Sequence, residues 1–248
     1  MSATQTAHDA QTAMPLIEAR NVTRILPGIV PTTLVQGINL RIAENEFVAI
    51  TGPSGSGKSS LLYLLGLLDL PTTGEVLIRG RATVHMDEEE RALTRLTQLG
   101  FVFQFHFLLP EFTVRDNVML PMRALGALSN SAMQERAHGL LASLGLADHV
   151  HKRPDQLSGG QRQRAAVARA LANEQPIILA DEPTGSLDSH ASEQVFEVLR
   201  DLVDKHGKTV VAVTHDLALA ARMDRHVELL DGQIVADEQH RLGITGRR

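Results

Sequence analysis

A glycine-rich segment of this chain has the residue types needed to bind phosphate. It combines three glycines with one lysine and several hydroxyl groups, in the order Gly52, Pro53, Ser54, Gly55, Ser56, Gly57, Lys58 and Ser59. Glycine lets the backbone approach an anion closely, so that several N–H groups point at one phosphate. In the pattern G-x-x-x-x-G-K-[ST], the lysine reaches the β- and γ-phosphates and the final hydroxyl binds Mg²⁺.

The flanking sequence favours a phosphate site over a simple Gly/Ser-rich turn. An apolar run over 47–51 predicts a strand before the loop, and a helical pattern begins at Ser60. A helix that starts there directs the positive end of its dipole at the bound anion. We therefore expect residues 52–60 to bind a nucleoside triphosphate with Mg²⁺.

A second apolar strand, Ile177–Ala180, ends in two carboxylates. At the end of a buried strand, Asp181 is placed to hold Mg²⁺ directly or through water. Glu182 follows it and is the candidate base that polarises water for attack on the γ-phosphate. An acidic surface pair is the alternative, but a fully apolar strand that delivers two carboxylates favours the nucleotide site.

A further glycine-bearing turn precedes a helix at Leu157-Ser158-Gly159-Gly160-Gln161, where a second anion site is expected. This pentapeptide resembles the signature of the ATP-binding cassette (ABC) ATPases. The resemblance extends from about Leu16 to Ala236, with the motifs in the order of that family.

The resemblance implies a role for each matching residue. Gln104 would contact Mg²⁺ or the attacking water, His215 would contact the γ-phosphate, and Asp188 ends the D-loop motif Ser186-Leu187-Asp188. The catalytic residues are then Glu182, His215, Gln104 and Lys58. The metal ligands are Ser59, Gln104 and Asp181, and the cofactors are ATP and Mg²⁺.

The resemblance also implies partners. In this family the signature residues Ser158, Gly159, Gly160 and Gln161 reach the nucleotide of a second copy in a head-to-tail homodimer. Separate membrane permease subunits bind such dimers at the cytoplasmic side of the membrane, so a cytoplasmic, peripheral location on its inner face is expected. Segments 103–110 and 114–121 are similar to the lipoprotein-release and macrolide-export branch, and Met86–Arg91 is similar to its YbbA-like members.

Composition limits the other function classes. The net charge of −5 offers no basic field for nucleic acid, so no nucleic-acid partner is expected. The chain has no cysteine, which excludes disulfides and cysteine-based metal sites. Residues 1–15 lack the apolar core of a signal peptide, and the longest apolar stretch, 61–70, is about half a membrane span.

Strands that alternate with helices predict an α/β fold. We expect a P-loop NTPase core with a mainly parallel sheet, an N-terminal antiparallel β subdomain, and an inserted α-helical subdomain. The expected limits are tails at 1–13 and 241–248 and one domain over 14–240. Its RecA-like core covers 14–103 and 165–240, and the helical subdomain covers about 104–164. Local patterns predict short strands at 16–19, 33–35 and 38–42, helical structure from 104 to about 153, and a helix from about Ser192 to Lys205.

Three other interpretations are weaker. A cassette for DNA maintenance or translation would carry a long coiled-coil insert or a second cassette. A small-molecule kinase would leave Leu157–Gln161 without a role. A guanine-nucleotide switch would need an Asn-Lys-x-Asp motif, which is absent.

Two segments leave questions open. Many members of the family stack an aromatic residue on adenine, but Thr23–Pro27 has none, so we expect Ile25 or Leu26 to pack there with weaker base selectivity. Phe105, Phe107 and Leu108 could dock a permease helix or belong to the core, and for Leu108 the two are equally favoured. Arg162, Arg164 and Arg169 are expected to lie on a solvated helix face.

Overall fold

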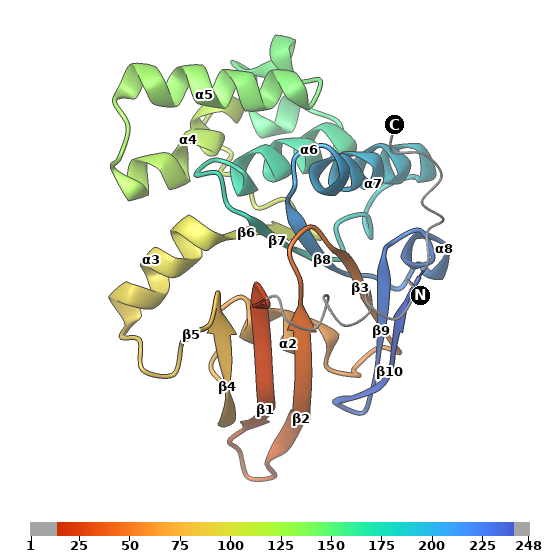
Figure 1. The fold of residues 1–248 in the computed structure, drawn as a ribbon. Helices are drawn as coiled ribbons and strands as arrows, with labels where there is room; N and C mark the ends of the chain where they lie inside the picture. The colour runs from red at the N-terminus through yellow and green to blue at the C-terminus, as the bar shows by residue number, and fades with distance from the viewer. Residues whose placement is uncertain (1–13, 241–248) are drawn as a thin grey trace, which may run out of the picture.

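The computed structural model describes residues 14–240, in which an antiparallel sheet, a mainly parallel sheet and a group of helices are stacked (Figure 1). The antiparallel sheet has the order β2-β1-β4-β5. Its strands are β1 (Ile17–Leu26), β2 (Thr32–Ile42), β4 (Thr73–Ile78) and β5 (Arg81–Ala82). The expected tails at 1–13 and 241–248 lie outside the described residues.

The second sheet has the order β10-β9-β3-β8-β7-β6. Its strands are β3 (Phe47–Thr51), β6 (Leu99–Phe103), β7 (Ile177–Asp181), β8 (Thr209–Val213), β9 (Arg225–Leu230) and β10 (Gln233–Gln239). All neighbours are parallel except β9 and β10, which form a hairpin. Its turn residues Asp231 and Gly232 have φ angles of 47° and 77°, as a two-residue hairpin turn requires. The expected fold class is confirmed.

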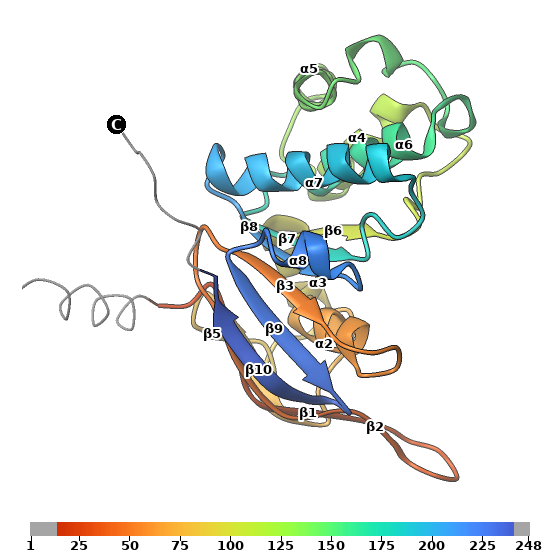
Figure 2. The ribbon, with the colours of Figure 1, turned by 90° about the vertical axis from the view of Figure 1, so that its right-hand side faces the viewer.

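Helices cover both faces of the parallel sheet (Figure 2). One face carries α2 (Lys58–Leu65), and α6 (Gly159–Ala170) and α7 (Ser189–Asp204) lie over the other. The remaining helices are α3 (Glu88–Gln98), α4 (Val114–Leu125), α5 (Asn130–Ser143) and α8 (Leu217–Ala220), with 3₁₀ turns at Ala147–His149 and Pro154–Gln156. No helix in the described part of the chain is long and apolar enough to span a bilayer.

The side chains of β3 explain why the sheet is covered on both faces. Phe47 and Ala49 pack into the hydrophobic core that contains α6 and α7. Val48 and Ile50 point the other way and pack with α2 and the antiparallel sheet. The strand is apolar from Phe47 to Ile50 and therefore lies between two cores, as expected for a buried parallel strand.

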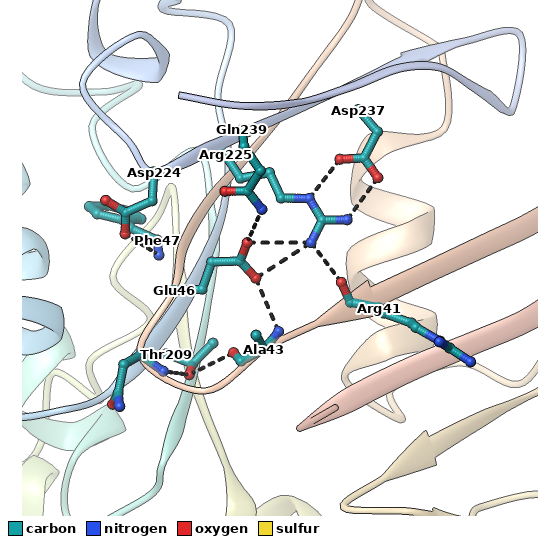
Figure 3. A network of polar contacts seen from close by, with 10 residues as sticks. Arg41, Ala43, Glu46, Phe47, Thr209, Asp224, Arg225, Asp237 and Gln239 are labelled. Atoms are coloured by element: carbon teal, nitrogen blue, oxygen red, sulfur yellow. Dashed lines mark hydrogen bonds and ion pairs between the residues drawn. The ribbon is translucent and has the colours of Figure 1, made fainter. Parts of the chain in front are cut away.

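A polar network joins the antiparallel layer to the parallel sheet (Figure 3). Arg225 of β9 donates to the carbonyl oxygen of Arg41 at 2.7 Å and to Glu46 at 3.3 Å. The same guanidinium binds both carboxylate oxygens of Asp237 at 2.6 and 2.7 Å. Gln239 of β10 completes the network by donating to Glu46 at 2.9 Å. The Arg225 guanidinium thus joins the backbone of β2 to Glu46 and to the β9–β10 hairpin.

Three local predictions were wrong in detail. The short strands predicted over 16–42 are two long strands, because register shifts in the β1–β2 pairing interrupt the alternation of apolar residues. Helix α7 begins at Ser189 rather than Ser192, because Asp188 caps it. Residues 104–113 form a loop and not a helix. The predicted limits of the core and helical subdomains stay a prediction.

Candidate nucleotide-binding site

The parallel sheet brings the predicted site residues to one edge. Its register aligns Phe103 with Asp181, Asp181 with Val213, and Val213 with Ile50. The segments that leave these strands therefore start side by side at their carboxyl ends. This edge of an open α/β sheet is where ligands commonly bind.

The loop between β3 and α2 approaches neighbouring strands so closely that two of its positions require glycine. A Cβ atom at Gly52, which has φ 140°, would overlap the carbonyl oxygen of Leu229. A Cβ atom at Gly57, which has φ 96°, would overlap the carbonyl oxygen of Leu34. The loop is therefore wrapped against β2 and β9, with its curvature fixed by contacts on both sides.

Lys58 closes this loop upon itself. Its ammonium donates to the carbonyl oxygens of Gly52 and Pro53 at 2.9 and 2.8 Å. The Ser56 hydroxyl is buried and has no hydrogen-bond partner among the described residues. A buried unpaired hydroxyl and a lysine held over a glycine-rich loop fit a phosphate group.

The carboxylate expected to hold Mg²⁺ has a hydroxyl on each oxygen. Ser59 donates to Asp181 Oδ1 at 2.9 Å, and Tyr63, one turn later in α2, donates to Oδ2 at 2.8 Å. Burial and this bond to Asp181 raise the pKa of Tyr63 to about 12. Ser59 and Asp181 form the oxygen-rich donor set that Mg²⁺ prefers.

The second carboxylate points into the same cleft from an unusual backbone conformation. Glu182 has φ 47°, while its N–H still bonds to Val213 at 3.0 Å. Its Oε2 lies 3.3 Å from Nδ1 of the exposed His215. A Cβ atom at Gly185 would lie 3.0 Å from Glu182 Oε2 and 3.1 Å from Gln104 Nε2, so both side chains lie beside that glycine. Left-handed non-glycine residues are costly and concentrate at functional sites.

A cleft of about 440 Å³ is lined by half of the predicted site residues; Gln104 and Asp181 are not among them. Glu182 and His215, which follow two other strands, line this cleft together with the phosphate loop. The lining residues from the loop and from α2 are Gly52, Ser54, Gly55, Gly57, Lys58, Ser59 and Ser60. Pro53 and Ser56 belong to the same loop. The signature residues 158–161 and Asp188 do not line this cleft.

The signature residues instead begin α6. Ser158 and Gln161 form a capping box, in which the Gln161 N–H donates to the Ser158 hydroxyl at 3.3 Å and Ser158 N–H donates to the Gln161 side chain at 2.9 Å. A Cβ atom at Gly160 would lie 2.9 Å from the Cβ of Ala191, so this glycine lets α6 and α7 meet closely. Asp188 caps α7 by accepting from Ala191 N–H at 2.8 Å.

Three residues that the sequence did not connect to the site fix the loop after Gln104. Buried Asn117 binds both backbone groups of Leu109, and buried Gln163 donates to the Phe103 carbonyl at 2.8 Å. Arg169 donates to the carbonyls of residues 106 and 107 at 2.7 and 2.6 Å. The expectation that Arg169 is solvated on a helix face was therefore wrong. Burial lowers its pKa from the usual arginine value.

The same loop presents an apolar surface beside Gln104. Phe105, Phe107 and Leu109 have exposed fractions of 63%, 61% and 42%, whereas Leu108 is 5% exposed and packs into the core. Leu108 is therefore a core residue. We define Phe105, Phe107 and Leu109 as the loop patch.

Two aliphatic residues lie in the cleft or at the end of β1, the segment expected to contact adenine. Leu34 of β2 lines the cleft, and Leu26 at the end of β1 is 39% exposed. The packing of Leu26 or Ile25 against adenine stays a prediction.

A glycine-rich loop with its lysine, a carboxylate bonded to the Ser59 hydroxyl and a second carboxylate beside it at one sheet edge are typical of a P-loop nucleoside triphosphatase. The family model described as "ABC transporter" matches residues 35–185, more than half of the chain. The chain therefore belongs to the ABC transporter ATPase family, and the predicted family and ATP hydrolase class are confirmed.

Relatives with known names place it in the expected branch. The chain is 50% identical over 230 residues to the lipoprotein-releasing system ATP-binding protein LolD of Anaeromyxobacter dehalogenans, covering 92% of this chain and 96% of that protein. It is 47% identical over 224 residues to the macrolide export ATP-binding/permease protein MacB of Hyphomonas neptunium, covering 90% of this chain and 34% of that protein. The finer likeness to YbbA-like members stays a prediction.

Solved structures of bacterial ABC cassettes have a similar fold. The dimeric ATP-binding cassette MJ0796 bound to ADP and Pi superposes with a TM-score of 0.83 at 43% identity, covering 90% of this chain and 98% of that one. A second dimeric structure of MJ0796, a bacterial ABC transporter cassette, gives a TM-score of 0.83 at 44% identity.

Proposed function

We propose that this chain is the ATP-binding and ATP-hydrolysing subunit of a transporter whose permease is a separate protein. The observation that carries the proposal is the cleft in which Glu182 and His215 face the phosphate loop. Names of relatives in the lipoprotein-release and macrolide-export branch support export, or extraction of a lipidated substrate, as the transport process. The working location is then the inner face of the cytoplasmic membrane.

The cleft residues, with Asp181 bonded to Ser59 and Gln104 close to Gly185, have distinct proposed tasks. The loop N–H groups and Lys58 bind the phosphates, and Ser59, Asp181 and Gln104 hold the metal. The ion held by these residues would supply positive charge that neutralises the charge developing on the phosphates. Glu182 orients and deprotonates the attacking water, and His215, 3.3 Å from Glu182, contacts the γ-phosphate side of the cleft.

The signature residues complete the site of a second copy. They start α6 and do not line the cleft of their own chain, although Ser158 is exposed. A helix N-terminus with exposed N–H groups is suited to an anion. In a head-to-tail homodimer, Ser158–Gln161 and Asp188 of one copy would face the nucleotide of the other, as the dimeric form of the related cassette supports.

The loop patch is the proposed contact for the permease. Its two phenylalanines are more than half exposed and lie directly after Gln104. Apolar side chains that are fixed at a surface by backbone hydrogen bonds fit a helix of a membrane partner. Because Gln104 begins this loop, docking and metal binding involve the same segment.

The first test replaces the proposed base. Glu182→Gln keeps the size of the side chain but removes the base, so we expect ATP turnover to fall about 10²- to 10⁴-fold. ATP and Mg²⁺ should still produce a dimer, measured by light scattering. The matched control is Glu135→Gln on the exposed side of α5, which should hydrolyse ATP normally. A Glu182→Gln chain that remains monomeric with ATP and Mg²⁺ contradicts the dimer mechanism.

The second test asks whether sites are shared between copies. Ser158→Arg and Lys58→Ala chains should each be inactive alone, but a mixture contains heterodimers with one intact site. We expect the mixture to recover a measurable part of the wild-type ATPase rate. Ser131→Arg, at an exposed serine of α5, is the control for the added charge. A mixture without any recovered activity argues against shared sites.

A further inference from the structure

Tyr63 occupies a position that the nucleotide-binding motifs do not explain. It lies on α2, four residues after Ser59, and its hydroxyl donates to Asp181 Oδ2 at 2.8 Å. The other carboxylate oxygen accepts from Ser59 at 2.9 Å. If Ser59 bound a metal ion, the Tyr63 hydroxyl would be the remaining hydrogen-bond donor to this carboxylate among the described residues. A ligating carboxylate is commonly held by such an outer partner.

The ring of Tyr63 begins a series of aromatic contacts that runs toward the surface. Its centroid is 6.4 Å from that of Phe103, with the planes at 66°. Phe103 in turn meets Phe107 edge to face, with centroids 5.5 Å apart and planes at 77°. Both separations lie within the range for aromatic pairs, which contribute about 0.5–1.5 kcal/mol each beyond area burial.

Hydrogen bonds to the backbone hold both phenylalanines of the series in place. Gln163 binds the carbonyl oxygen of Phe103, and Arg169 binds that of Phe107. Phe101 stacks on Phe103 with centroids 5.9 Å apart, which limits how far the Phe103 ring can tilt. The exposed Phe107 ring therefore contacts Phe103, and Phe103 contacts Tyr63, so the three rings form a continuous path.

We propose that Tyr63 is a positioning residue that orients the Asp181 carboxylate for metal binding and couples it, through Phe103 and Phe107, to the loop patch. The inference rests on the proposed function, since it presumes that Asp181 binds Mg²⁺ with ATP and that the loop patch meets a partner. It assigns the coupling to packed rings and one hydrogen bond, in addition to the backbone path through Gln104.

The hydrogen bond is tested by Tyr63→Phe in a Glu182→Gln chain, which does not consume ATP. The measurement is the Mg²⁺ concentration that gives half of the rise in Tm at a fixed ATP concentration. We expect Tyr63→Phe to need about 10- to 100-fold more Mg²⁺, because the outer partner that orients a ligating carboxylate is lost. The control, Thr97→Val, removes an exposed hydroxyl that bonds to Leu93 in α3 and should leave the midpoint unchanged.

The two possible failures are distinct. If the parent chain shows no Mg²⁺-dependent rise in Tm with ATP, the proposed function is overturned. If the parent responds and Tyr63→Phe has the same midpoint, the positioning role is overturned. The Tm of each variant without ligand verifies that it is folded.

The aromatic coupling has its own readout, because Tyr63 is the only tyrosine in the chain. A protein labelled with ¹³C-tyrosine gives one set of ring signals, which report on this residue alone. Phe107→Leu should shift these signals, whereas the equally exposed Phe105→Leu, which has no ring contact with Phe103 among the described residues, should not. Signals that respond equally to both substitutions, or to neither, overturn the coupling.

Discussion

Asn117→Ala should lower the stability of the folded chain, because this residue of α4 holds the 104–113 loop in place. The Asn117 side chain is fully buried, and three of its hydrogen bonds are no longer than 3.1 Å. They satisfy the N–H and carbonyl groups of Leu109 and the carbonyl of Thr113. At about 1 kcal/mol each, their loss costs about 3 kcal/mol. Alanine returns about 0.5 kcal/mol through its higher helix propensity.

The net change of about 2.5 kcal/mol corresponds to a fall in Tm of about 5–10 °C for a chain of this size. Calorimetry or circular dichroism measures it directly, with Asn130→Ala as the control, since Asn130 is exposed at the start of α5. A fall below about 2 °C, or one no larger than that of Asn130→Ala, would refute the view that Asn117 holds the 104–113 loop.

Three further predictions concern packing, ionisation and base selectivity. Gly100→Ala should lower the free energy of unfolding by about 1–3 kcal/mol in denaturant titration, because the added Cβ would overlap the carbonyl oxygen of Ala170. The control Gly139→Ala, on the open face of α5, should raise the free energy of unfolding by about 0.5–1 kcal/mol. The single phenol, Tyr63, should ionise near pH 12 in the folded chain and near pH 10 in denaturant, as measured by absorbance; stability is then complete below pH 10 and declines as the pH rises towards 12. Asp181→Asn should bring that pKa part of the way back towards 10, since burial is its larger cause. ATP and GTP should be hydrolysed at comparable rates, and strict ATP preference that survives Leu26→Ala would contradict aliphatic packing of the base.

The fold could be predicted because its central signals are local. The apolar runs of β3, β7 and β8 are each followed by predicted site residues. Because these strands are neighbours in a parallel sheet, the site residues lie at one edge of that sheet. The β1–β2 hairpin was harder to predict, since its register shifts break the alternation on which strand prediction depends. The start of α7 required knowing that Asp188 caps a helix rather than ending a turn.

The site was predicted by motif, and its supports were not. Residues such as Asn117, Gln163 and Arg169 act by binding backbone groups up to 63 positions away in the chain, as in the Arg169 bond to residue 106. No local pattern carries that information. Tyr63 had a partial signal: it follows Ser59 by four residues, which places both on one face of a helix. Which carboxylate that face would meet depended on the strand order.

The oxygen and the proton of the Ser158 hydroxyl have different roles, which substitutions can separate. Its oxygen accepts the Gln161 N–H and so caps α6, while its own proton stays free to donate elsewhere. Aspartate at this position would keep the acceptor and lose the donor, so a Ser158→Asp chain should fold normally and yet fail to complete a neighbouring site. Threonine keeps both. A substitution that keeps the oxygen acceptor and removes the proton therefore separates the capping of α6 from the completion of a neighbouring site.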